Sequence, residues 1–108
     1  MPVDQRLALR IADLKPGMRD VLLEAEVIEV SAPKVITARG SERTILEATI
    51  SDETGRIKLV LWDDKIIELR PGDKIIVSGG AVTSFKGEWR LNVSRGGKIE
   101  RLRSQKST

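Results

Sequence analysis

Turn-forming residue pairs interrupt this chain at short intervals, and they limit the regular elements between them to the length of β-strands. Gly and Pro favour turns because Gly tolerates positive φ angles and Pro fixes φ. The stretches between the turns alternate apolar and polar residues, so they predict short strands and an all-β barrel or sandwich. A chain of 108 residues has the size of one domain. The turn pairs are Pro16-Gly17, Ala32-Pro33, Arg39-Gly40, Pro71-Gly72, Gly79-Gly80, Lys86-Gly87 and Gly96-Gly97.

The alternating stretches predict five strands. The first changes its apolar phase near residues 27–28, which indicates a strand that bends through two sides of a small barrel. Residues 31–43 are expected to form a polar loop, and Gly55 is expected to supply an unusual φ in the turn 52–55. Gly79-Gly80 predicts a bulge inside the fourth strand. The five strands cover residues 19–30, 44–51, 56–63, 74–85 and 88–94, and Ile99 and Leu102 leave room for a last short one.

One short helix is expected after the third strand. Residues 63–69 would begin at Asp63 or Asp64 as N-cap and end before Pro71-Gly72, and their apolar side chains would cover one end of the barrel. Five strands with a long bent first strand and a helix after the third describe the OB-fold. The predicted class is therefore all-β, a five-stranded OB-fold barrel with one short helix after strand 3. Its usual ligand surface is the face of strands 2 and 3, between the loops that join strands 1–2 and 4–5.

The chain divides into three parts around this barrel. We expect residues 1–18 to form an N-terminal extension that packs on the barrel, residues 19–102 to form the OB-fold domain and residues 103–108 to form a flexible basic tail. No apolar run approaches the ~20 residues of a membrane span, and the charged N-terminus lacks the apolar core of a signal peptide. We therefore expect an intracellular protein without a membrane partner.

The residue types present exclude much of enzyme chemistry. There is no Cys and no His, hence no thiolate or imidazole metal site, no Cys nucleophile and no His base. The acidic pairs Asp52-Glu53 and Asp63-Asp64 fall at a turn and at a helix start, where Asp favours local hydrogen bonds over Mg²⁺ or acid–base work. We expect no catalytic activity, no metal, no cofactor and no small-molecule substrate.

Aromatic residues are scarce, so each position needs an explanation. Trp62 falls on the outward face of the third strand beside Lys58, where an exposed ring and a cation would suit base stacking. Its alternative is a plug at the barrel mouth. Phe85 lies at the tip of the 4–5 hairpin and is either a second stacking ring or folded back onto its hairpin. Trp89 shares a face with Leu91, which favours a packing role at one end of the barrel.

Positive charge gathers around the predicted ligand face. Residues 86–108 carry 7 Lys and Arg against 2 Asp and Glu, whereas residues 1–85 carry 12 against 14. A basic segment of this kind favours an anionic partner, although isolated surface cations are usually just solvated. The cations expected around the face are Arg39 and Arg43 in the 1–2 loop, Lys58 on strand 3, and Lys86 and Arg90 in the 4–5 hairpin.

Two stretches resemble a known family. They are RTILEATISDETGRIKLVLWDD and LRPGDKIIVSGGAVTSFKGEWRLNVSRGG. They are similar to the simple single-OB single-stranded DNA-binding proteins, which include the crenarchaeal kind and the single-OB subunit of the eukaryotic single-stranded-DNA sensor complex. The DETG turn, the LW strand end, the PGD before strand 4 and the FKG hairpin occur in the family's order, and the resemblance covers about residues 11–102.

The resemblance implies which residues touch the ligand. The family stacks bases on an aromatic that ends strand 3, here Trp62, and on the Phe of the FKG hairpin, here Phe85. A platform after the bend of strand 4 falls on Ala81 and is missing, and a strand 5 aromatic falls on Asn92, which can hydrogen-bond a base or sugar but cannot stack. The family usually has an aliphatic residue at position 89, which agrees with a packing role.

The sequence thus predicts a non-catalytic protein that binds single-stranded DNA with little sequence preference. Stacking on aromatics and phosphate contacts from Lys and Arg would hold the strand, in a role that protects single-stranded DNA in replication and repair. An RNA-binding OB module is an alternative, because nothing in the sequence reads the 2′-hydroxyl. A protein-interaction or scaffold OB subunit is the other, favoured by the missing platform at Ala81.

Overall fold

The computed structural model describes residues 8–102 of the chain. Seven strands and two short 3₁₀ turns follow one another along these residues. The tail expected at 103–108 lies outside the described residues. In chain order the elements are η1 Ile11–Asp13, β1 Val21–Val30, β2 Lys34–Ala38, β3 Ser41–Asp52, β4 Gly55–Trp62, η2 Asp63–Lys65, β5 Lys74–Phe85, β6 Glu88–Val93 and β7 Lys98–Arg101.

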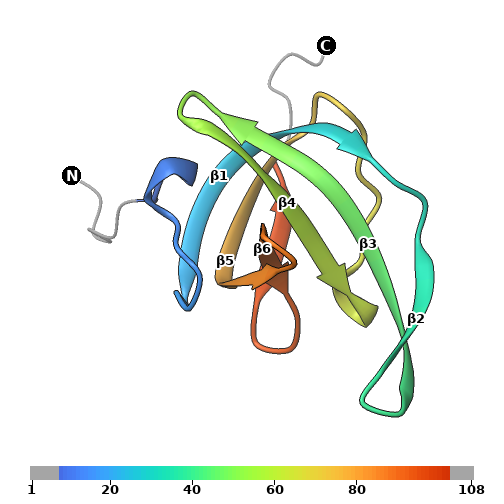
Figure 1. Cartoon of the computed structure of the whole chain (residues 1–108). Helices are drawn as coiled ribbons and strands as arrows, with labels where there is room; N and C mark the ends of the chain where they lie inside the picture. Colours follow the sequence, from blue (N-terminus) through green and yellow to red (C-terminus); the bar gives the residue numbers. More distant parts are fainter. Residues whose placement is uncertain (1–7, 103–108) are drawn as a thin grey trace.

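Five of these strands close into a barrel, so the predicted OB-fold class is confirmed (Figure 1). The strands follow the order β1-β3-β4-β6-β5, and β5 pairs again with β1. Every pairing in this ring is antiparallel except that of β4 with β6, which is parallel. Two short strands extend the sheet outside the ring, β2 on β3 and β7 on β5.

The predicted bend and bulge are both present. The pairing of β1 with β3 shifts between Val27 and Glu29, where the apolar phase of the sequence slips. The pairing of β1 with β5 shifts between Gly80 and Val77, because an extra residue of β5 sits opposite β1 there. A Cβ on Gly80 would lie 2.8 Å from Leu91 Cδ1, so the core packs directly against this backbone.

Alternating side chains of the ring strands fill the barrel. Leu23, Ile50, Leu59, Ile75 and Leu91 have no exposed surface. Burying a side chain of this size stabilises the folded state by roughly 1.5–3 kcal/mol relative to exposure. The described residues contain no buried polar or charged residue, so the interior depends on apolar packing alone and the polar chemistry lies on the outside.

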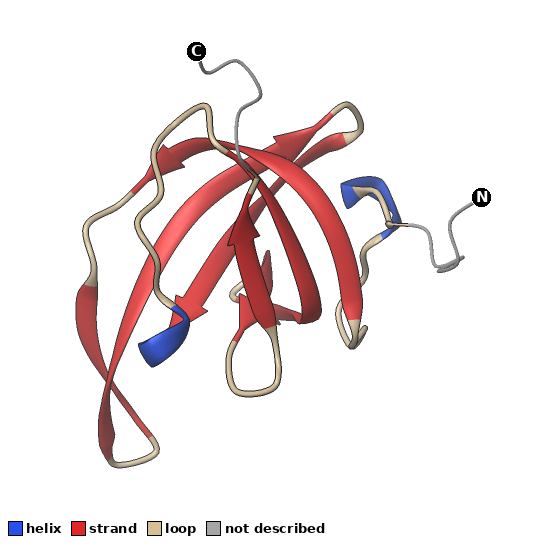
Figure 2. Cartoon of the chain, turned by 180° about the vertical axis from the view of Figure 1, so that it is seen from behind, coloured by secondary structure: helices blue, strands red, loops and turns tan. Residues whose placement is uncertain are grey.

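The predicted polar loop at 31–43 is wrong, because most of it forms a hairpin. β2 pairs with β3 from Lys34 opposite Ile45 to Ala38 opposite Ser41, and β3 therefore begins three residues earlier than predicted. Arg39 and Gly40, with φ of 54° and 79°, connect them, as in the two-residue turns that fit twisted strands. Figures 1 and 2 show the β2–β3 hairpin reaching beyond the barrel wall.

The expected helix at 63–69 is also largely absent. Only Asp63–Lys65 forms a 3₁₀ turn, and Ile66 is already extended. The Asp63 carboxylate does not cap its own turn, because it accepts hydrogen bonds from the Thr44 backbone and the Arg43 side chain of β3. Residues 66–69 have no regular secondary structure, but Leu69 is buried and Ile66 and Ile67 pack partly against the core.

The turn between β3 and β4 is held by Asp52 rather than by a special Gly55 conformation. Gly55 does not have a positive φ. One oxygen of Asp52 accepts hydrogen bonds from the backbone and hydroxyl of Thr54 and from the Gly55 backbone, and the other accepts one from Ile11 N at 2.8 Å. Burial pushes the pKa of Asp52 up, but these bonds outweigh it and hold the pKa below its ordinary value.

The described part of the N-terminal segment lies against the barrel. Leu9 forms an isolated bridge with Leu23 of β1, and Ile11 and Leu14 are buried in the core. Gly17 N donates to the Val82 carbonyl of β5, and Val82 N donates to the Met18 carbonyl. Among residues 8–102, no helix is long and apolar enough to span a membrane.

Candidate functional site

The outer faces of β3, β4, β6 and the end of β5 form one continuous surface, which we call the sheet face. Cross-strand pairing places neighbouring residues side by side on this surface. Ile45 pairs with Trp62, and Lys58 pairs with Arg90. Val60 lies between Glu47 of β3 and Asn92 of β6. Val60 is only 1% exposed although it points outward, so side chains from the neighbouring strands cover it. The sheet face has an apolar centre with polar and charged groups around it, and consists of Arg43, Ile45, Glu47, Thr49, Lys58, Val60, Trp62, Ala81, Thr83, Phe85, Arg90 and Asn92.

Trp62 ends β4 on the sheet face and is partly exposed, which does not fit a plug of the barrel. Its indole N–H donates to Asn92 Oδ1 at 3.1 Å, and the Arg43 guanidinium lies 4.8 Å from the ring centroid. Arg43 is held in turn by Asp63. The Thr44 N–H and the Arg43 side chain keep the pKa of Asp63 below its ordinary value, so its charge is retained. The ring is therefore fixed from two sides.

Asn92 has its side-chain amide engaged within the protein. Its oxygen accepts from Trp62, and its NH₂ group donates to Thr83 Oγ1 at 2.9 Å and to the Ala81 carbonyl at 3.4 Å. These partners fit the amide because β6 lies between β4 and β5 in the sheet. The arrangement gives Asn92 a role in holding Trp62, which the sequence did not reveal.

Phe85 lies at the tip of the β5–β6 hairpin and is 53% exposed, so its ring keeps an accessible surface beside the other residues of its hairpin. The predicted tight turn Lys86-Gly87 is present, with φ of 51° and 81°. Arg90 Cζ lies 5.0 Å and Lys86 Nζ 5.4 Å from the ring centroid. An exposed ring with two cations beside it offers both a stacking surface and phosphate partners.

Two carboxylates were missed by the sequence analysis, Glu47 in the middle of the sheet face and Glu88 at the hairpin end opposite Phe85. Glu47 lies 3.7 Å from Arg90 and 3.9 Å from Lys58, and it also reaches Lys34 of β2 at 3.7 Å. Glu88 lies 3.1 Å from Arg90 and 3.6 Å from Lys58. The hydrogen bond from Arg90 is the main cause that lowers the pKa of Glu88. Strand phase could have found Glu47, because it alternates with the buried Leu46 and Ala48.

The predicted cations therefore differ in their surroundings. Lys58 and Arg90 are paired with Glu47 and Glu88, and Arg43 is paired with Asp63. Lys86 is exposed beside Phe85. Arg39 is at the tip of the β2–β3 hairpin, beyond the barrel wall, so the fold does not bring it to the rings. Ala81, the missing platform, lies next to Asn92 on the sheet face.

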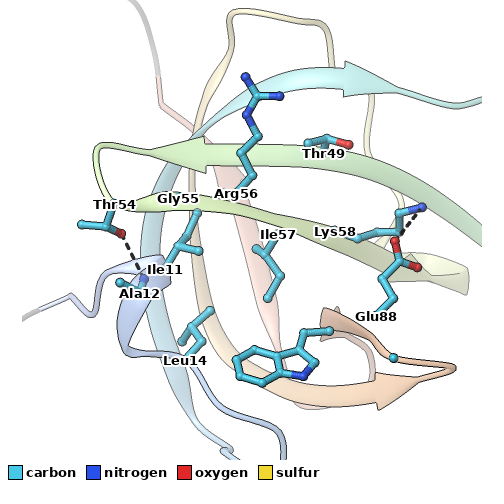
Figure 3. Close-up of a pocket in the computed structure, with 12 residues that line it drawn as sticks. Ile11, Ala12, Leu14, Thr49, Thr54, Gly55, Arg56, Ile57, Lys58 and Glu88 are labelled. Carbon is cyan, nitrogen blue, oxygen red and sulfur yellow. Dashed lines mark hydrogen bonds and ion pairs between the residues drawn. The ribbon is translucent and has the colours of Figure 1, made fainter.

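Trp89 differs from its prediction as a core residue. It shares the inner phase of Leu91 and Val93, which are fully buried, but is itself 46% exposed. It precedes the point where β6 begins to pair with β4 at Lys58, so no strand covers it on that side. Instead it borders a cleft of about 590 Å³ with Ile11, Leu14 and Ile57 (Figure 3).

The acidic side chains of the described residues are spread over separate parts of the fold. Residues 8–102 contain no group of three acidic side chains placed to hold a metal ion. Asp52 makes the local hydrogen bonds expected at its turn, whereas Asp63 bonds the Thr44 backbone of β3 rather than its own turn.

Comparisons with known proteins point to one family. A family described as "Single-stranded DNA binding protein Ssb-like, OB fold" matches residues 14–101. The single-stranded DNA binding protein Ssb of Saccharolobus solfataricus is 36% identical over 90 residues, which cover 83% of this chain and 61% of that protein. An uncharacterised Arabidopsis thaliana protein is 31% identical over 102 residues, covering 85% of this chain and 67% of that one.

The fold also matches solved structures. The OB domain of a Thermoplasma acidophilum protein has a TM-score of 0.77 at 19% identity, and the match covers 94% of this chain and 92% of that one. This chain spans about three fifths of the length of the Saccharolobus protein.

Proposed function

This chain belongs to the Ssb-like family of single-stranded DNA binding proteins with an OB-fold, and from this membership we propose that it binds single-stranded DNA without catalysis and with little sequence preference. The observation that carries the proposal is the pair of rings on one sheet face. Trp62 and Phe85 are both accessible there, and Arg43, Lys86 and Arg90 lie against them.

Base stacking supplies the main attraction. Trp62 is held by Asn92 and Arg43, so little side-chain freedom is lost when a base packs on it. The base either replaces Arg43 on the ring or stacks on the guanidinium itself, which is also a stacking surface. Phe85 takes a second base at the hairpin tip. Each stacked base contributes roughly 1–3 kcal/mol.

Phosphate binding at the centre of the sheet face requires cations to exchange a carboxylate partner for a phosphate. Lys58 and Arg90 already hold Glu47 and Glu88, so a phosphate must compete with these carboxylates. Lys86 and Arg43 lie at the margins of the sheet face, beside the two rings. We infer that the backbone follows these margins and the bases face the apolar centre over Val60. With two stacking rings, micromolar to sub-micromolar affinity is expected.

Low sequence preference follows from which groups are already engaged. The Asn92 amide, the group best suited to read a base edge, bonds Trp62, Thr83 and Ala81. Stacking surfaces accept every base because each base has a π-face. We propose that the protein coats and protects single-stranded DNA during replication and repair inside the cell.

Oligonucleotide titration tests the proposal. Intrinsic Trp fluorescence should be quenched by poly(dT) at low salt, and added salt should reverse the quenching because phosphate contacts release counterions. Competition between DNA and RNA oligonucleotides of one sequence separates DNA from RNA binding, and preferred RNA binding would overturn the DNA assignment. Absence of quenching by either polymer would overturn nucleic-acid binding altogether.

A further inference from the structure

The cleft beside Trp89 adjoins the sheet face, but Trp89 and the apolar wall of the cleft have no role in the binding described above. It opens between η1, the first half of β4 and the start of β6 (Figure 3). Resting on the proposed binding of single strands, we propose that this cleft receives one further base of the same strand, stacked on Trp89.

Shape and lining suit a flat aromatic group. Ile11, Leu14 and Ile57 are buried core residues whose outer surfaces form an apolar wall, and Trp89 contributes an accessible ring. In Figure 3 the side chains of Ile11, Leu14 and Ile57 project toward the same hollow. A volume of about 590 Å³ is within the range of small-ligand pockets and holds a base with its sugar.

The cleft continues the sheet face without a barrier. Lys58, Thr49 and Glu88 border the cleft and also belong to the sheet face or pair with it. Phe85 is opposite Glu88 in the β5–β6 hairpin, and Ser84 is opposite Trp89. The two exposed rings therefore occupy consecutive rungs of one hairpin on its opposite faces, so a strand that passes Phe85 reaches Trp89 by turning around one edge.

Charge favours a nucleotide over an apolar peptide. Arg56 and Lys58 both border the cleft from β4. Figure 3 shows Arg56 directed to the opposite side of β4 from Ile57, and Lys58 directed toward Glu88. A backbone that lies over β4 meets these two cations while its base turns into the apolar hollow. A peptide would need only the hollow and would gain nothing from the cations.

Oligonucleotides of two lengths test the proposal in the whole chain. A (dT) oligomer of about 4 nucleotides fits the sheet face alone, and one of about 12 nucleotides reaches the cleft. Trp89→Ala should weaken binding of the longer oligomer about fivefold or more and leave the shorter one unchanged. Trp89→Phe, which keeps a ring, should restore most of the loss.

Controls separate this proposal from the function on which it rests. If the wild type binds neither oligomer, the proposed function fails and the cleft has no strand to receive. If the wild type binds both but Trp89→Ala weakens both equally or neither, only the cleft proposal is overturned, and a peptide ligand becomes the better explanation. Should Trp89→Ala fail to fold, Arg56→Glu against the exposed Arg70→Glu gives the same length comparison.

Discussion

The indole N–H of Trp62 and the side-chain oxygen of Asn92 are hydrogen-bonded across the parallel β4–β6 pair, 3.1 Å apart. Asn92 also reaches β5 through Thr83. One amide on β6 thus ties the Trp62 ring of β4 to β5 as well, and it fixes the orientation of the ring on which we propose that a base stacks.

We expect Asn92→Ala to weaken DNA binding through Trp62, because the Asn92 amide already bonds Trp62, Thr83 and Ala81. Loss of one hydrogen bond costs about 0.5–1.5 kcal/mol, and Trp62 becomes more mobile. Time-resolved fluorescence anisotropy of the free protein, in a Trp89→Phe background, measures that mobility. Thr83→Ala is the control, because it leaves the Trp62 bond intact. Unchanged anisotropy in Asn92→Ala would contradict the positioning role.

Truncating the exposed rings should reduce affinity but not stability. Trp62→Ala and Phe85→Ala are each expected to cost about 1–3 kcal/mol of binding. Phe85→Ala should leave the melting temperature unchanged, since the ring is 53% exposed at a hairpin tip. Val35→Ala removes an exposed apolar side chain from β2 and should change neither property. Wild-type affinity in both ring variants would rule out stacking at these positions.

Removing the central carboxylate should strengthen binding. Glu47→Gln frees Lys58 and Arg90 from a partner at 3.7–3.9 Å and removes one negative charge from the path of the phosphates. A unit charge at this distance in a watery environment is worth about 1 kcal/mol, or about fivefold in affinity. The slope of log K against log salt should steepen by about 0.7 for each additional phosphate that the variant neutralises.

A matched variant shows whether the gain in affinity comes from the position of Glu47 or only from the change in net charge. Glu68→Gln removes the same charge from an exposed pair with Arg70, away from the sheet face, and should leave affinity and slope unchanged. Weaker binding in Glu47→Gln would show instead that this carboxylate positions the cations.

Asp52 should make stability depend on acid pH. Its pKa in the folded state is held below the ordinary value by the Thr54, Ile11 and Gly55 hydrogen bonds, so the carboxylate binds protons less readily than in the unfolded chain. Its stabilising effect is complete above the ordinary Asp pKa of about 4 and is lost as pH falls through the lower, folded pKa.

Denaturant unfolding of Asp52→Asn at several pH values measures this effect. At pH 7 the variant should be about 1–3 kcal/mol less stable than the wild type, because bonded backbone groups lose an acceptor. The difference should shrink toward pH 3. Glu53→Gln, at the neighbouring exposed position, should match the wild type throughout. A difference that is constant with pH would contradict the assignment.

Gly80 and Gly55 should differ sharply in how well they tolerate substitution by Ala. Gly80→Ala places a Cβ 2.8 Å from Leu91 Cδ1, and overpacking of this kind costs about 1–3 kcal/mol. Gly55→Ala meets only Ile11 Cγ2 at 3.7 Å and has no positive φ to strain, so its melting temperature should stay near that of the wild type. Equal melting temperatures for both variants would contradict the packing at Gly80.

The sequence was sufficient to predict the five strands of the barrel ring. A single apolar interior requires each of these strands to alternate apolar and polar residues. β5 has the predicted bounds, and its bulge at Gly79-Gly80 follows from the same pattern. The hairpin of β2 was missed because none of its side chains, apolar or polar, is buried, so the strand has no alternating buried stripe. Val35 and Ile36 before Arg39-Gly40 were nevertheless the signal of a short strand and a two-residue turn.

Side-chain pairing across the sheet could not be derived from alternation alone. Strand phase placed Trp62, Lys58 and Arg90 on one face, which is where they lie. It could not give the register that puts Asn92 beside Trp62, or Glu47 between the cations. Trp89 was misplaced because inner phase implies burial only where a neighbouring strand covers the residue, and β4 and β6 begin to pair one residue later.

The parallel pairing of β4 with β6 affects how the chain folds during synthesis. Residues 58–61 must wait for residues 90–93 before that side of the barrel can close, and the N-terminal segment must wait for Val82. A nascent chain leaving the ribosome thus exposes apolar β3 and β4 side chains until residues 90–93 have emerged. Closure between such distant segments belongs to the slow class of small-domain folding, on a scale of about milliseconds to seconds.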